Sequence, residues 1–271
     1  MKAKNLSLEP RALLAELVGT FILAVVAVTV ANPIIVGFTL VVLVLAIGAV
    51  SGAHVNPAVT FGLWSIKKLE TIKLPFYWAA QVLGALLALL VIQMFSSTDF
   101  SLSFASFNNF EGKLVIAEIL GTAVFTFAIA AAVHRGFADA AKSVAIGFGL
   151  LTGLAVGGGL LGQALQTTQA PTGENQEVSR VTKVDGVVLN PAIALAGTEK
   201  AEQPSLNMFG QEAEEPESPK QPASRLTWET LIGALVGGAI GMNLYMVTAG
   251  VNPFAKETIA TKVVKKVKGK K

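Results

Sequence analysis

Six long apolar blocks dominate this chain of 271 residues. Most of them approach the roughly 20 residues that an α-helix needs to cross a lipid bilayer, and the second is the shortest. They occupy residues 12–31, 34–50, 75–95, 113–133, 143–163 and 228–249. Hydrophobic residues make up 52% of the sequence and charged residues only 14%, well below the roughly 25% of a soluble domain. The sequence therefore predicts an all-α membrane protein with six transmembrane helices in the lipid bilayer.

Positive charges indicate the orientation of these helices. When six spans are threaded, both termini and the connections that contain Lys67, Lys68, Arg135 and Lys142 lie on one side. By the positive-inside rule this side is cytoplasmic, and we expect the cell (plasma) membrane as the location. The Lys-rich tail at 251–271 is then a basic cytoplasmic tail near lipid headgroups, and no nucleic-acid partner is expected. A cleaved signal peptide at the N-terminus is disfavoured, because no soluble domain follows the first block.

The tripeptide Asn-Pro-Ala occurs twice, at Asn56-Pro57-Ala58 and at Asn190-Pro191-Ala192. Asn is a strong N-cap and Pro suits the first helical position, so each copy predicts a helix start. Asn32-Pro33 and Asn252-Pro253 lack the following Ala, and we expect them only to start or end a helix. Each run that follows is only about two turns long, at 56–64 and at 190–197, and reaches about 12 Å at 1.5 Å per residue. Neither can span the bilayer. The sequence predicts two re-entrant half-helices, whose irregular loops must line a wet cavity or be covered by protein.

A second repeated segment indicates an internal duplication. Ala15–Thr20 reads AELVGT and Ala117–Thr122 reads AEILGT. The duplication predicts a first repeat at 1–111 and a second at 112–250, each with three spans and one half-helix. An odd number of spans puts the two copies in opposite orientation, as in other inverted-repeat membrane proteins. The second repeat also contains polar insertions at 164–186 and 199–225.

The segment Ser51–Thr60, SGAHVNPAVT, resembles the first signature of the aquaporin, or major intrinsic protein (MIP), family. The two AExxGT segments, the pattern from Tyr77-Trp78 to Gln81 and Gly84, and the stretch from Gly233 to Tyr245 are also similar to helices of that family. The resemblance covers nearly the whole chain except about 164–185 and 199–225. It implies six spans with two half-helices, a homotetramer with one pore per subunit, and passage of water or small neutral solutes. It implies no enzymatic activity and no cofactor.

Glu16, Glu118 and His54 are the polar residues of interest inside the apolar part of the chain. Intramembrane carboxylates are functional candidates by default, and a proton relay is one possible role. The resemblance implies another: Glu16 and Glu118 accept hydrogen bonds from backbone N–H groups of the re-entrant loops, and His54 helps to position a loop. With His54 and His134 as the two histidines, and no cysteine, we expect no metal site.

The resemblance also identifies the four positions of a selectivity filter. They are Val36, Leu154, Val187 and Ile193. The family usually has Arg directly after the second Asn-Pro-Ala, so this chain is an atypical member. An all-aliphatic ring predicts a wider constriction, few hydrogen bonds for a passing solute, and no fixed cation to exclude positive ions. Such a ring can pass small neutral molecules or close by dewetting.

Several alternatives stay open. The leading function is a passive channel in which paired half-helix dipoles exclude protons. A closed structural or adhesion protein of the same fold is the second hypothesis, and a coupled secondary transporter is the third. The insertions are tolerated surface loops, or else a lid or a docking element for a partner. Residues 181–188 alternate in part and predict a short strand.

Overall fold

The computed structural model describes residues 9–96, 101–107, 110–168, 179–200 and 223–253. In this part of the chain eight α-helices and one short 3-10 helix account for the regular structure. Their bounds are α1 Pro10–Thr29, α2 Pro33–Ser51, α3 Pro57–Ser65, α4 Lys73–Phe95, α5 Gly112–His134, α6 Asp139–Gln166, η1 Arg180–Lys183, α7 Pro191–Ala196 and α8 Trp228–Thr248. With η1 set aside, the same succession occurs twice along the chain: two long helices, one short helix and one long helix.

Six of these helices are long and apolar enough to cross a membrane, as predicted, and they are α1, α2, α4, α5, α6 and α8. Their outward faces carry large apolar side chains, and Leu14, Val42 and Ile116 are each more than half exposed. Such a continuous apolar exterior is unstable in water and suits contact with lipid. The expected all-α membrane fold is confirmed.

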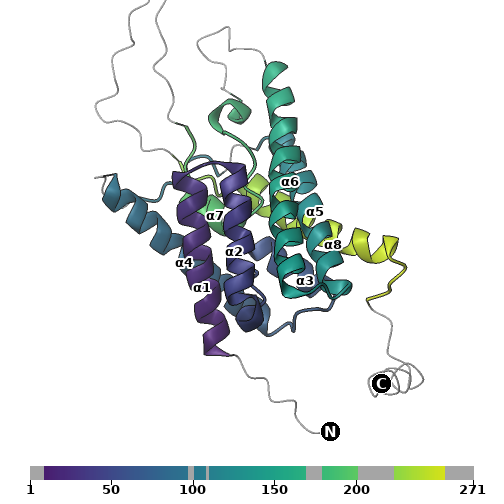
Figure 1. Ribbon diagram of the computed structural model, residues 1–271. Helices are drawn as coiled ribbons and strands as arrows, with labels where there is room; N and C mark the ends of the chain where they lie inside the picture. The colour runs from purple at the N-terminus through teal and green to yellow at the C-terminus, as the bar shows by residue number, and fades with distance from the viewer. Residues whose placement is uncertain (1–8, 97–100, 108–109, 169–178, 201–222, 254–271) are drawn as a thin grey trace, which may run out of the picture.

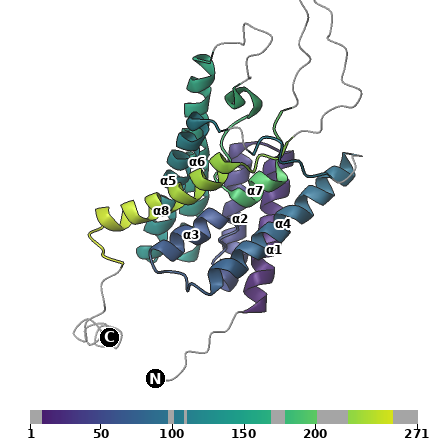
Figure 2. The ribbon, with the colours of Figure 1, turned by 180° about the vertical axis from the view of Figure 1, so that it is seen from behind.

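The short helices α3 and α7 lie inside the bundle, α3 in its lower half and α7 in its upper half (Figures 1 and 2). Every α7 residue is buried, and Pro57 to Thr60 at the start of α3 are buried as well. Their ends toward the bundle centre are the N-terminal ends, because the Asn side chains that precede them contact each other's loops. Both helices therefore begin near the same level inside the bundle.

Close helix crossings in the bundle depend on glycines of α6 and α8. A methyl group on Gly153 of α6 would lie 2.5 Å from the carbonyl oxygen of Gly121 in α5. One on Gly237 of α8 would lie 2.5 Å from the carbonyl oxygen of Ile119. One on Gly238 would lie 2.6 Å from the carbonyl oxygen of Ala58 in α3. Any side chain at these positions would push the helices apart.

Two smaller expectations concern the loops. Asn32 caps α2, where its Oδ1 accepts from the backbone N–H of Ile34 and Ile35, so Asn32-Pro33 starts a helix as expected. The expected strand within 181–188 is wrong, because the chain forms the 3-10 helix η1 and then a loop that runs into α7. Most of the tail at 251–271 lies outside the described residues, as do 169–178 and 201–222 of the two insertions.

Candidate pore

The two Asn-Pro-Ala segments cap the two short helices in the same way. The Oδ1 atom of Asn56 accepts from the backbone N–H of Ala58 at 2.7 Å, and that of Asn190 accepts from Ala192 at 3.1 Å. Each Pro occupies the first turn, where its missing N–H is not needed. These hydrogen bonds hold each Asn side chain in a single rotamer, whose amide nitrogen points away from its own helix.

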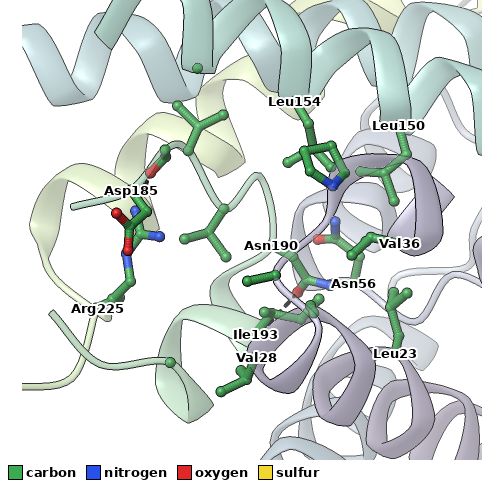
Figure 3. Close-up of a pocket in the computed structure, with 18 of the residues that line it drawn as sticks. Leu23, Val28, Val36, Asn56, Leu150, Leu154, Asp185, Asn190, Ile193 and Arg225 are labelled. Carbon is green, nitrogen blue, oxygen red and sulfur yellow. Dashed lines mark hydrogen bonds between the residues drawn. The ribbon is translucent and has the colours of Figure 1, made fainter. Parts of the chain in front are cut away.

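The amide nitrogens join the two segments reciprocally. Asn56 Nδ2 donates to the carbonyl oxygen of Leu189 at 2.9 Å, and Asn190 Nδ2 donates to that of Val55 at 2.9 Å. An Asn amide has two N–H donors, so each side chain keeps one donor beyond this contact. Both residues also line a cavity (Figure 3). The arrangement therefore places two amide donors and two helix N-termini at one point of the cavity wall.

Two buried glutamates support the loops that enter the short helices. Glu16 of α1 accepts from the backbone N–H of His54 at 2.9 Å and of Val55 at 2.7 Å. Glu118 of α5 accepts from Val188 at 2.7 Å and from Leu189 at 2.9 Å. The bilayer core offers no water to these N–H groups, and each would cost several kcal/mol if left unpaired.

The residue before each Asn has a left-handed backbone. Val55 has a φ of 43° and Leu189 a φ of 58°. This conformation is costly for residues other than glycine, by about 1–3 kcal/mol each, and persists where surrounding contacts enforce it. Here the glutamate holds the N–H of each residue while the opposing Asn holds its C=O.

Polar side chains that sequence reasoning did not assign complete the first loop. Gln81 of α4 donates from Nε2 to Glu16 at 2.8 Å and to Thr60 Oγ1 at 2.9 Å. His54 Nδ1 lies 3.2 Å from the same hydroxyl, and the Tyr77 hydroxyl donates to the carbonyl oxygen of Ser51 at 2.9 Å. The segment from Tyr77 to Gln81 formed part of the resemblance, but nothing in its spacing indicated which loop it would contact.

The cavity has a volume of about 470 Å³ and runs from the two Asn side chains toward the end of α1. Val36, Leu154, Val187 and Ile193 all line it, from α2, α6, the loop before α7 and α7 itself. Figure 3 shows Leu23, Leu150 and Leu154 directed into the same space. The four predicted filter positions thus lie around one cavity, which is largely aliphatic beside the Asn pair.

Arg225 also lines this cavity, although no pattern in the sequence indicated that it would. Its Nη2 atom donates to the carbonyl oxygen of Gly186. Burial lowers the pKa of the Arg225 guanidinium, while Glu118, Glu199 and Asp185 act in the opposite direction. Arginine stays protonated in proteins. A distant segment thus brings an arginine to the cavity wall, although Ile193 stands where the family usually has one.

A cluster of buried charges lies behind the same end of the cavity. Arg180 of η1 donates from Nη1 to Glu229 at 2.7 Å and from Nε to Glu199 at 3.0 Å. Ser106 Oγ donates to Glu199 at 2.6 Å, and the backbone N–H of Glu111 donates to Glu229 at 2.7 Å. We call these residues the outer clamp. It joins the loop after α4 and the segments on either side of α7 to α8, and sequence spacing did not reveal it.

No cluster of three or more metal-binding side chains exists within the described ranges. The chemistry of the cavity is therefore that of aliphatic side chains, backbone carbonyls, two Asn amides and a few charges at one end. Most of the lining thus consists of uncharged groups.

Comparison with known proteins agrees with this geometry. The sequence profile of the Major intrinsic protein family matches residues 3–170. Aquaporin Z from Photorhabdus laumondii is 31% identical over 169 residues, which cover 52% of this chain and 73% of that protein. Aquaporin TIP4-4 from Zea mays is 34% identical over 144 residues, which cover 53% of this chain and 54% of that protein.

A solved structure gives the same architecture. The aquaglyceroporin from Plasmodium falciparum superposes with a TM-score of 0.55 and 19% identity, and the match covers 87% of this chain and 95% of that one. At this identity the match bears on the fold alone.

Six spanning helices around two half-helices that meet inside the bundle define a class of integral membrane channel. The chain belongs to the Major intrinsic protein family, whose profile matches more than half of its residues. It is therefore an integral membrane protein and a passive channel for water or small uncharged solutes, as predicted. Membership of a channel family also agrees with the expectation that it is not an enzyme.

Proposed function

We propose that solutes cross this protein through the cavity beside Asn56 and Asn190, and that this Asn pair prevents protons from following. The observation that carries the proposal is the reciprocal hydrogen bonding of two segments far apart in the sequence, Asn56 with Leu189 and Asn190 with Val55. These hydrogen bonds bring the N-termini of α3 and α7 to the same level beside the cavity.

The proposed mechanism depends on the donors at this level. A water molecule at the Asn pair accepts hydrogen bonds from both amides, so both of its own hydrogens point away, toward neighbouring waters. It cannot then receive a proton from one side and pass one on to the other. The partial positive charge at a helix N-terminus adds a barrier for any cation. Neutral molecules that accept hydrogen bonds meet no such barrier.

The aliphatic positions Val36, Leu154, Val187 and Ile193 are our proposed filter. Their side chains offer no hydrogen bonds, so a solute that enters must give up hydration with little replacement. This favours water, ammonia and small weakly hydrated neutral solutes over sugars and ions. Glu16, Glu118 and His54 are proposed to hold the two loops in the shape that keeps the passage open.

The experiment is stopped-flow light scattering on proteoliposomes that contain the purified protein. We expect faster osmotic shrinkage than in empty liposomes, and faster entry for at least one of ammonia, urea and glycerol. The control is the double variant Asn56→Ala/Asn190→Ala, which should raise proton flux in a pH-sensitive dye assay. If no neutral solute crosses faster than in empty liposomes, the closed structural protein becomes the better hypothesis.

The proposal includes three features of organisation. The halves 1–111 and 112–250 act as inverted repeats around the Asn pair, supported by the two matched successions of helices. Both termini are cytoplasmic, in the plasma membrane, and the protein forms a homotetramer. Size-exclusion chromatography with light scattering tests the assembly.

The absence of cysteine makes orientation testable. We expect a membrane-impermeant maleimide to label Lys200→Cys from outside the cell, and Arg135→Cys only after permeabilisation. The opposite labelling pattern would reverse the proposed topology.

A further inference from the structure

Four charged side chains line the cavity, and three of them have close partners of opposite charge. Asp185 and Lys200 form an ion pair at 2.5 Å, and Glu199 is bound by Arg180. Arg225 differs, because no carboxylate in the part of the chain that the structure describes lies within ion-pair distance of it. Its hydrogen-bond acceptor is a neutral backbone carbonyl, that of Gly186. Its guanidinium therefore has no direct ion-pair partner, and the carboxylates of Glu118, Glu199 and Asp185 favour its charged form from a greater distance.

Arg225 is held firmly at both its backbone and its stem. Its backbone N–H donates to the carbonyl oxygen of Gly197 at 2.9 Å, and its C=O accepts from the Thr230 hydroxyl at 2.9 Å. The stem lies against Gly197, where an added methyl group would be 3.6 Å from the Arg225 Cδ atom. Gly197 directly follows α7, one turn after Ile193. The guanidinium is thus fixed in place before any solute arrives.

The anchor points of Arg225 adjoin two positions of the aliphatic ring. Gly186, which accepts from the guanidinium, directly precedes Val187, and Gly197 caps the helix that carries Ile193. Figure 3 shows Arg225 and Asp185 at one end of the cavity, with Val36 and Asn56 toward the other and Asn190 between them. A solute moving from this end to the Asn pair passes the guanidinium first.

A fixed charge in such a position acts strongly on ions. Low-dielectric walls such as these aliphatic side chains reduce screening, so a single charge several ångströms away alters the local concentration of ions by roughly tenfold or more. Neutral solutes are unaffected by this monopole and can use the guanidinium as a hydrogen-bond donor.

We propose that Arg225 is the specificity-determining cation of this channel, supplied by the segment before α8 in place of a residue directly after the second Asn-Pro-Ala. The proposal rests on the proposed function, since it presupposes that solutes pass through the cavity. It assigns to Arg225 the exclusion of protons and metal cations at the outer end, before the Asn pair is reached. The competing explanation is that Arg225 only anchors the loop at Gly186.

Two substitutions separate charge from anchoring. Arg225→Gln removes the charge but keeps an N–H donor that can reach toward Gly186. Arg225→Lys keeps the charge but loses the planar fork that fits the carbonyl. The matched control is Arg135→Gln, because Arg135 lies just beyond the other end of α5 and does not line the cavity. Size-exclusion chromatography and thermal unfolding establish that each variant is folded.

Cation leak is measured in proteoliposomes with a pH-sensitive dye under a potassium diffusion potential, and water flux by light scattering. For Arg225→Gln we expect about tenfold more cation leak, while water flux stays well above that of empty liposomes. Arg225→Lys and Arg135→Gln should keep the low leak. The double variant Arg225→Gln/Ile193→Arg should restore exclusion, because it returns a guanidinium to the cavity wall.

The outcomes are distinct. A leak in Arg225→Gln that Ile193→Arg suppresses supports the proposal. Equal leaks in Arg225→Gln and Arg225→Lys mean that anchoring and not charge matters, which overturns it. A cation leak in Arg225→Gln no higher than in the original protein overturns it as well, even while water flux shows that the channel conducts. Should Arg225→Gln not fold, a raised leak in Arg225→Lys would overturn the proposal by itself. Absence of any neutral flux in the unaltered protein would instead refute the proposed function.

Discussion

The two re-entrant loops use the same contacts at the Asn pair but are supported from different places. Both have a glutamate that holds two backbone N–H groups, a left-handed residue before the Asn, and an Asn that caps a short helix. The first leads into α3, with nine residues, and the second into α7, with only six. The shared contacts define the meeting point, and the remainder of each loop has diverged.

Inside the bundle, the first loop is supported by uncharged polar side chains. Gln81 links Glu16 to Thr60, and His54 lies against the same Thr60 hydroxyl. The position in the second segment that corresponds to Thr60 is Ala194, which has no side-chain hydroxyl to continue such a network. The first loop is therefore held by neighbouring spans and depends little on what lies outside the membrane.

Besides Glu118 of α5, segments outside the spans support the second loop. Ser224 Oγ donates to the last carbonyls of α7, those of Ala194 and Leu195, at 3.1 and 3.2 Å. Arg225 binds the carbonyl of Gly186 at the other end of the loop, and the outer clamp fixes the flanking chain. The first loop is therefore held mainly by spanning helices, whereas the second is held by one spanning helix and by the connections, which also carry charged side chains.

The largest expected effect is loss of a loop glutamate. Glu16→Ala leaves three donors without their acceptor, whereas Glu118→Ala leaves two. At about 1–3 kcal/mol for each unsatisfied group, Glu16→Ala should lower the free energy of unfolding by about 4 kcal/mol or more, and Glu118→Ala by less. Thermal unfolding in detergent measures both.

The control is Glu9→Ala, at an exposed position just before α1, which should hardly change the free energy of unfolding. A greater loss in Glu118→Ala than in Glu16→Ala would contradict the idea that the first loop depends more on its own glutamate.

The next effect concerns the outer clamp. Arg180→Met leaves Glu199 and Glu229 buried without their counter-charge, and the expected cost is about 3 kcal/mol. The loss of stability should be concentrated around the second loop. Backbone amides of residues 186–199 should then exchange hydrogen faster, while the exchange rates of residues 51–60 stay the same. Mass spectrometry of exchanged peptides measures it.

Lys142→Ala is the comparison for Arg180→Met, because it breaks a surface pair whose side chains are 32% and 87% exposed. It should cost no more than about 1 kcal/mol. Similar losses in both variants, or protection lost equally in both loops, would show that the clamp does not act on the second loop alone.

The smallest effect is expected for the network of the first loop. Thr60→Val removes the hydroxyl that accepts from Gln81 while it keeps the shape of the side chain, and should cost about 1 kcal/mol. Thr152→Val, at an exposed position where the hydroxyl bonds only within α6, should cost less than half as much. Chemical unfolding in mixed micelles compares the stabilities of the two variants. Equal losses of stability would mean that this network does not stabilise the first loop.

Local patterns in the sequence were enough for most of the architecture. Long apolar blocks gave the six spans to within a few residues, and the Asn-Pro steps gave the starts of α2, α3 and α7. These features depend on length, hydrophobicity and capping, which act over one or a few helical turns. Bilayer thickness then leaves few folds for such a chain.

The contacts at the outer end of the cavity could not be predicted in this way. Arg225 is separated from Gly186 by α7 and the residues that follow it, and Arg180 reaches Glu229 across a similar interval. No periodicity relates such positions. For the same reason nothing about Ile193 indicated that an arginine from elsewhere in the chain lines the cavity.

By itself the sequence determined where the chain crosses the bilayer and where the two short helices begin, because apolar length and helix caps are local properties. Only the tertiary structure decided which side chains support each loop and which charged side chains line the cavity. Hydrogen bonds and ion pairs of buried groups form between whatever partners the packed helices bring together, and that proximity exists only in the folded protein.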